Sequence, residues 1–119
     1  MTDERIAREL EARGCPEHVV RGGRQGLIAR WGAFVREVER GYELGIEDYQ
    51  NDLDMRTLIE DLGLADAAEV SAADERMKRN LVRTELKLWH GPENAFWIYG
   101  RPRNVAEDLR QDLEARDWL

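Results

Sequence analysis

The sequence has little of what marks a secreted or membrane-bound protein. It contains one cysteine, Cys15, so no disulfide can form within the chain, and we interpret this residue as a small hydrophobic side chain. No apolar run approaches the ~18 residues that indicate a membrane-spanning helix. The first ten residues, MTDERIAREL, are charged where a secretory signal has an apolar stretch. We therefore expect a cytoplasmic protein that does not bind membranes.

Proline is also scarce, with three residues in 119, whereas Ala, Glu, Leu and Arg are abundant and 36% of the residues are charged. This composition favours helices over strands. The chain is long enough to bury a core without disulfides or metals. We predict a single all-α domain over residues 1–119, a compact bundle of five to six helices.

The longest stretch with one helical phase is residues 26–42, GLIARWGAFVREVERGY. On a helix its apolar residues fall within about 120° of arc, and the charged residues take the rest. These apolar residues are Leu27, Ile28, Trp31, Phe34, Val35, Val38 and Tyr42. The pattern predicts a central helix with one buried face.

A short first helix is predicted over residues 3–13, with Ile6 and Leu10 on its apolar side. Gly14 follows in the position that often ends a helix in the left-handed conformation.

Pro16 suits the first position of a second short helix over residues 16–21. This helix either stands alone or continues into residues 26–42 through a bend at Gly22-Gly23. We interpret RGGRQG at residues 21–26 as a turn, because it lacks the preceding strand and the glycine spacing of phosphate-binding loops.

Residues 46–62 show a shift of apolar phase. Ile46, Tyr49 and Leu53 cluster on one side, and a second group lies about 150° away and comprises Met55, Leu58, Ile59 and Leu62. The stretch is either two helices, the second capped by Asp52 or Asp54, or one continuous helix buried on two sides. We favour the continuous helix, because neither Gly nor Pro interrupts it.

Residues 72–89 are predicted as a third core helix, with Ser71 as its N-cap and Asp74 three residues later. The alternative is a helix that ends near Arg83, followed by a hairpin of residues 84–90 and 95–101. Residues 95–100, AFWIYG, are the one stretch with strand character. Asn104 and Glu107 resemble a capping box and predict a last helix over residues 105–117.

Negative charge is concentrated in the middle of the chain. Residues 41–75 hold eleven acidic residues and a single base, Arg56, whereas the net charge of the whole chain is -7. A nucleic-acid-binding protein normally carries a basic surface, so this distribution argues against nucleic acid as a partner. Arg56 can reach Asp52 or Glu60 on a helix, and we predict a structural ion pair with Asp52.

Four carboxylates, Glu47, Asp48, Asp52 and Asp54, come closest to a chemical signature. Asp48 and Asp52 are one helical turn apart, a spacing that metal sites and acid–base pairs can use. The chain nevertheless lacks the paired Glu-x-x-Glu or Glu-x-x-His units of metal-binding bundles. We predict no metal, cofactor or catalytic residue, and we interpret the four carboxylates as an acidic binding face.

A second candidate surface is the aromatic segment that contains Trp89, His90, Trp97 and Tyr99. Such clusters usually form core that closes the end of a bundle. The alternative is a surface that binds a partner or a second copy of the chain.

The sequence favours a non-enzymatic interaction module whose acidic face binds a basic protein, as inhibitory, immunity-type or nucleic-acid-mimicking proteins do. The alternatives are a metal-dependent hydrolase that uses the helix carboxylates and a homo-oligomeric structural protein.

Overall fold

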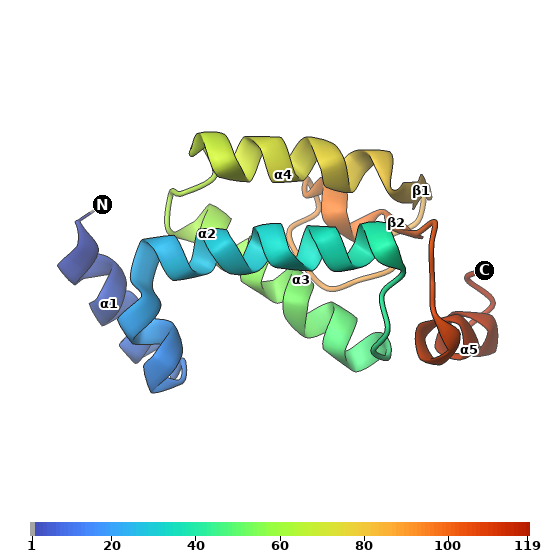
Figure 1. Cartoon of the computed structure of the whole chain (residues 1–119), viewed down its shortest axis with the longest axis horizontal. Helices are drawn as coiled ribbons and strands as arrows, with labels where there is room; N and C mark the ends of the chain where they lie inside the picture. The colour runs from blue at the N-terminus through green and yellow to red at the C-terminus, as the bar shows by residue number, and fades with distance from the viewer. Residues whose placement is uncertain (1) are drawn as a thin grey trace.

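Helix α2 is the element on which the other helices pack. The computed structural model describes residues 2–119, and α2 contacts α1, α3 and α4 (Figure 1). The elements in chain order are α1 (Asp3–Ala12), α2 (Glu17–Arg40), α3 (Ile46–Asp61), α4 (Ala68–Arg79), β1 (Leu81–Arg83), η1 (Phe96–Ile98), β2 (Gly100–Pro102) and α5 (Glu107–Ala115). The predicted helical bundle with a short hairpin is confirmed.

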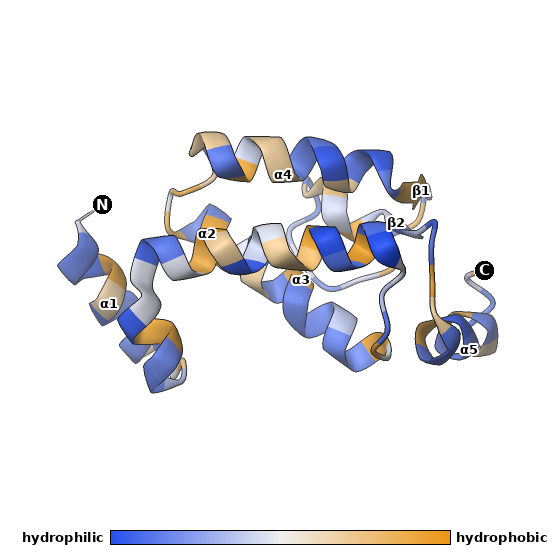
Figure 2. Cartoon of the chain, in the orientation of Figure 1, coloured by the Kyte–Doolittle hydropathy of each residue, from blue (hydrophilic) through white to orange (hydrophobic). Residues whose placement is uncertain are grey.

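The predicted apolar face of residues 26–42 forms the centre of the core. All seven predicted side chains, from Leu27 to Tyr42, are buried, and they join buried residues of every other helix. Figure 2 shows orange, hydrophobic positions recurring along α2, with blue, hydrophilic residues over much of α3 and α5. Within residues 2–119, none of the helices combines the length and apolar character that crossing a bilayer requires.

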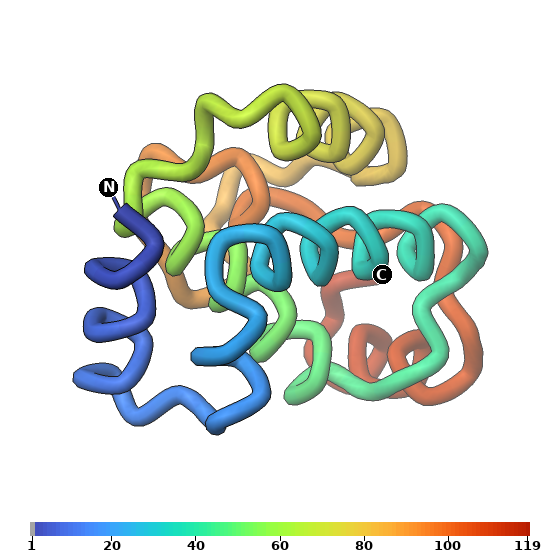
Figure 3. The backbone as a smooth tube through the Cα atoms, turned by 60° about the vertical axis from the view of Figure 1, so that its left-hand side comes forward, coloured from blue at the N-terminus to red at the C-terminus, as the bar shows by residue number. Residues whose placement is uncertain are grey.

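A bend inside α2 separates its first turns from the rest of the helix. Gly23 has φ 56° and ψ -145°, a conformation that residues with a Cβ rarely adopt, so α2 changes direction there (Figure 3). α1 ends as predicted, with Gly14 at φ 75° and the Cys15 amide donating to the Leu10 carbonyl. The bend lets α1 pack beside α2 and bury Ile6 and Leu10.

Helix α3 is continuous, as favoured from the sequence. Its buried positions are Tyr49, Leu53, Arg56 and Ile59, which form one stripe at helical spacing. The apparent shift of apolar phase arises because a charged residue, Arg56, occupies the middle of this stripe.

The third core helix is shorter than predicted. α4 begins at Ala68, so Ser71 lies inside the helix instead of capping it, and α4 ends at Arg79 instead of Trp89. The residues that follow pair with a distant strand, β1 with β2, in an antiparallel register that places Arg83 opposite Gly100. The hairpin alternative was right in kind, but its strands are residues 81–83 and 100–102.

The C-terminal helix is also shorter than predicted. α5 starts at Glu107 after Ala106, and Asn104 donates its side-chain amide to the Glu39 carbonyl, so the predicted capping box is wrong. α5 instead caps another helix, because a carboxylate oxygen of Asp112 accepts from the Ile46 amide at 2.9 Å. This carboxylate lies at the positive end of α3 and positions its first turn.

Candidate functional site

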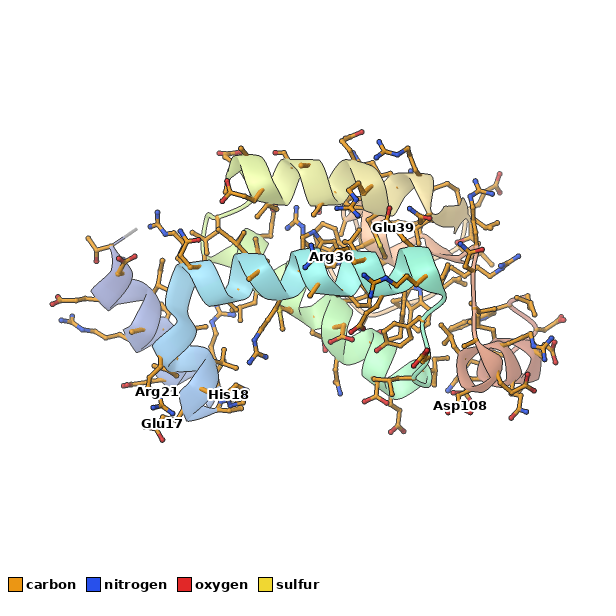
Figure 4. All side chains as sticks on the ribbon, viewed as in Figure 1. Glu17, His18, Arg21, Arg36, Glu39 and Asp108 are labelled. Carbon is orange, nitrogen blue, oxygen red and sulfur yellow. The ribbon has the colours of Figure 1, made fainter. Side chains whose placement is uncertain are left out.

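Ion pairs neutralise four of the eleven acidic residues in the middle third of the chain. Glu60 and Asp74 pair with Arg56, Asp61 pairs with Arg13, and Glu75 pairs with Lys78. On α2, Glu39 pairs with Arg76 across the contact with α4 (Figure 4). These acids neutralise neighbouring bases and contribute to the packing of the helices.

A second group of carboxylates lies where α2 ends and α3 begins, and we call it the acidic cluster. Its members are Glu37, Glu43, Asp48 and Asp52. In the part of the chain that the structure describes, none of them forms an ion pair. Glu37, Glu43 and Asp48 are exposed, and Asp52 is half-buried.

A surface cavity of about 380 Å³ adjoins this cluster. Glu37 and Glu43 line it together with Arg40, Gly41 and Leu44. Leu44 is one of the few large apolar residues that reach solvent, with 50% of its surface exposed. The cavity therefore combines two carboxylates with an apolar contact, and Arg40 is the base at its edge.

Tyr42, which follows α2, is hydrogen-bonded to Asp52 of α3 within the acidic cluster. Its ring is buried in the core, and its hydroxyl donates to a carboxylate oxygen of Asp52 at 2.7 Å. Burial raises the pKa of the Tyr42 phenol, and the charges of Asp52, Asp48 and Glu37 raise it further. The phenol consequently stays protonated and acts as a hydrogen-bond donor.

The pKa of Asp52 is raised above its ordinary value. Burial is the main cause, and the Asp48 carboxylate adds to it. The hydrogen bond from Tyr42 and the charge of Arg30 act in the opposite direction. The ionised form of Asp52 is thus disfavoured in the folded protein, although nearby donors lessen the cost.

Replacing Asp52 by asparagine is expected to increase the free energy of unfolding at pH 7 by up to about 1 kcal/mol. The folded carboxyl group binds its proton more tightly than the unfolded one, so ionisation at neutral pH costs stability, and acidification below the ordinary carboxyl pKa, to about pH 3, restores it. Asparagine keeps an oxygen that can accept from Tyr42. Urea unfolding at both pH values measures the difference, which should vanish at the lower pH. A variant that is less stable at pH 7 contradicts the expectation.

The four predicted carboxylates do not form one face. Asp48 and Asp52 belong to the acidic cluster, whereas Glu47 lines a different cavity, beside Trp89 and Trp118. Asp54 is exposed and accepts a hydrogen bond from the Gln50 side chain at 2.8 Å. Within residues 2–119, no group of three or more His, Cys, Asp or Glu side chains is arranged to hold a metal ion, so the metal-hydrolase alternative gains no support.

Arg56 forms a structural ion pair, but the predicted partner Asp52 is wrong: of the two residues within reach on the helix, Glu60 is the one it contacts. Arg56 is 4% exposed and binds the Asp74 carboxylate through Nε at 2.9 Å and Nη2 at 2.8 Å. Glu60 lies 3.4 Å from Nη1, and the guanidinium stands 4.4 Å from the centre of the Trp97 ring. Both Asp74 oxygens are used, and Oδ1 also accepts from the Trp31 indole, so this group joins α2, α3 and α4.

The two tryptophans of the aromatic segment belong to the core. Trp89 and Trp97 are each 3% exposed, and their indole N–H groups donate to the Gly100 carbonyl and the Thr57 hydroxyl. The alternative of a binding surface is therefore wrong for both. His90 remains exposed and Tyr99 half-buried.

Comparison of the chain with protein-family models, curated proteins and solved structures gives no match. Function must be argued from the residues alone.

Two members of the acidic cluster were missed by the sequence argument, and so was the role of Tyr42. Glu37 looked like any charged residue on the polar side of the central helix, and Glu43 follows that helix in the turn. Tyr42 was predicted as core, which is correct for its ring. The signal that could have shown the phenol's role is its position at the end of an apolar stripe, where a hydroxyl can reach the surface.

Proposed function

We propose that this protein is a non-enzymatic interaction module, and that its acidic cluster binds a Lys- and Arg-rich segment of a partner protein. The observation that carries the proposal is the contrast in pairing. Glu60, Asp61, Asp74 and Glu75 each form an ion pair, while the four carboxylates of the acidic cluster form none in the described part of the chain. Unneutralised like charges grouped at one place reduce stability and attract a basic partner, so the grouping supports a role in binding.

The chemistry of the cluster specifies the partner. The two carboxylates that line the cavity, Glu37 and Glu43, together with Asp48 and Asp52 of the same cluster, attract ammonium and guanidinium groups and increase the rate of encounter with a basic surface. Leu44 beside Glu37 and Glu43 offers apolar contact to the methylene groups of a Lys or Arg side chain. A basic peptide segment can satisfy both features at once.

The test is fluorescence anisotropy with a short labelled peptide in which Arg and Lys alternate with Ser. We expect affinity to fall with increasing salt, because the charges are exposed. The variant Asp48→Asn/Asp52→Asn should bind about tenfold more weakly, a loss of roughly 1.4 kcal/mol.

The matched control is Asp66→Asn/Glu69→Gln. It removes the same charge from two exposed acids that form no ion pair within residues 2–119. The control should bind nearly as well as the unaltered protein. Equal losses in both variants, or binding that does not respond to salt, would refute the proposal.

A further inference from the structure

A second cavity lies on another side of the molecule, between the start of α3, the loop at residues 88–90 and the C-terminal residues. Its volume is about 430 Å³, within the ~300–1,000 Å³ typical of small-molecule sites. Its walls include Ile46, Glu47, Asn51, Trp89, Arg116 and Trp118. We call it the tryptophan cavity.

The apolar walls of this cavity are held by the core. Trp89 is buried and packs edge-to-face on Trp118, with ring centres 5.4 Å apart. The loop is fixed to α3 by the Gln50 carboxamide, which accepts from the His90 amide at 2.9 Å and donates to the His90 carbonyl at 3.1 Å. The cavity is therefore largely formed before any ligand arrives.

The polar walls of the cavity contain an acid and a base that do not pair. Glu47 and Arg116 both line it, yet within residues 2–119 neither forms an ion pair with the other or with any other residue. The Arg116 guanidinium lies 5.5 Å from the centre of the Trp118 ring, so one face contacts an aromatic surface and its N–H groups remain available.

We propose that the tryptophan cavity binds a free aromatic α-amino acid. The ligand's ammonium group pairs with Glu47, its carboxylate pairs with Arg116, and its ring packs on Trp118. The observations favour a zwitterion because the charged walls carry one group of each sign, and a ligand with a single charge would leave one of them unmatched. The apolar surface of Ile46 and Trp118 beside these two charges favours an apolar group on the ligand.

This proposal is independent of the acidic cluster. Glu47 and Asp48 are adjacent in sequence but point to different sides of α3, since successive helix residues differ by about 100° in direction. Loss of peptide binding at the acidic cluster would leave the tryptophan cavity unchanged.

The experiment is a titration of the isotope-labelled protein followed by amide and indole NMR shifts, with L-phenylalanine, N-acetyl-L-phenylalanine and L-phenylalanine amide as probes. We expect L-phenylalanine to shift resonances of the cavity residues. The other two probes, which lack the ammonium or the carboxylate charge, should bind at least about tenfold more weakly. L-alanine, without a ring, should also bind more weakly.

Two variants assign the charged contacts. Glu47→Gln should bind L-phenylalanine and its N-acetyl form with similar affinity, and Arg116→Gln should do the same for L-phenylalanine and its amide. The controls Glu69→Gln and Arg83→Gln change exposed charges outside the cavity and should retain the original preferences. Absence of shifts at millimolar L-phenylalanine, or equal binding of all three probes by the unaltered protein, would overturn the proposal.

Discussion

Replacing Asp74 by alanine is expected to lower the free energy of unfolding by about 3–5 kcal/mol, because it removes one partner of a buried ion pair. The substitution removes both acceptors of the Arg56 guanidinium and the acceptor of the Trp31 indole. It leaves a cation in a site where the Arg56 side chain is only 5% exposed. Glu60 cannot replace Asp74, because its contact is longer and its side chain is half exposed.

Two further variants, compared with Asp74→Ala by urea unfolding, serve as controls. Glu75→Ala removes the neighbouring carboxylate from the same helix, but its pair with Lys78 is exposed, so the loss should stay below about 1 kcal/mol. Arg56→Met/Asp74→Leu removes both charges together and should recover much of the stability. If Asp74→Ala cost no more than Glu75→Ala, Arg56 would not depend on Asp74.

Gly100→Ala is expected to destabilise the fold by about 1–3 kcal/mol, because its new Cβ would lie 2.8 Å from the Val82 carbonyl oxygen. That oxygen belongs to the paired strand and cannot rotate away as a side chain can. The shift would also disturb the Gly100 carbonyl, which accepts from the Trp89 indole at 2.7 Å. The added methyl group would thus disturb both the pairing of β1 with β2 and the hydrogen bond of the buried Trp89.

Gly26→Ala is the matched control for this change. Gly26 lies inside α2, and its Cβ would meet no atom within 4 Å. Alanine should therefore stabilise the helix by about 0.5–1 kcal/mol. Thermal and urea unfolding should show a lower free energy of unfolding for Gly100→Ala and a higher one for Gly26→Ala. A Gly100→Ala variant as stable as the unaltered protein would show that the strands can separate without cost.

The helices that could be predicted are those whose pattern is local. The apolar stripe of α2 requires only the spacing of residues along one stretch, and the same holds for Ile6, Leu10 and Gly14 in α1. In α3 the continuity was predictable from the absence of Gly and Pro, but the stripe was not, because an arginine occupies a core position. Its burial depends on Asp74, eighteen residues away, which no local pattern connects to it.

The third helix was predicted wrongly because tertiary contacts override local preference there. Asp74 looked like part of a capping signature. Its Oδ1 instead accepts from Arg56 and from the Trp31 indole, and its Oδ2 accepts from Arg56. Residues 81–83 leave the helical phase because β2 offers them hydrogen bonds, and Gly100 permits the close approach.

The candidate site was predictable only in part for a similar reason. The acidity of residues 41–75 is plain in the sequence, and Asp48 and Asp52 were singled out by their spacing, although Asp52 was expected to pair with Arg56. Which acids are neutralised depends on partners such as Arg13 and Lys78, and those pairings exist only once the helices are packed. Glu37 joins the cluster from the preceding helix for the same reason.

The conformation of Gly23 determines the outline of the molecule. A straight helix of the 24 residues in α2 would be about 36 Å long, whereas the whole molecule measures 43 × 25 × 25 Å. Without this corner, the first two turns would project past the end of the bundle and carry α1 away from the residues that cover Ile6 and Leu10. A residue that contributes no side chain therefore keeps the first fifth of the chain in contact with the remainder.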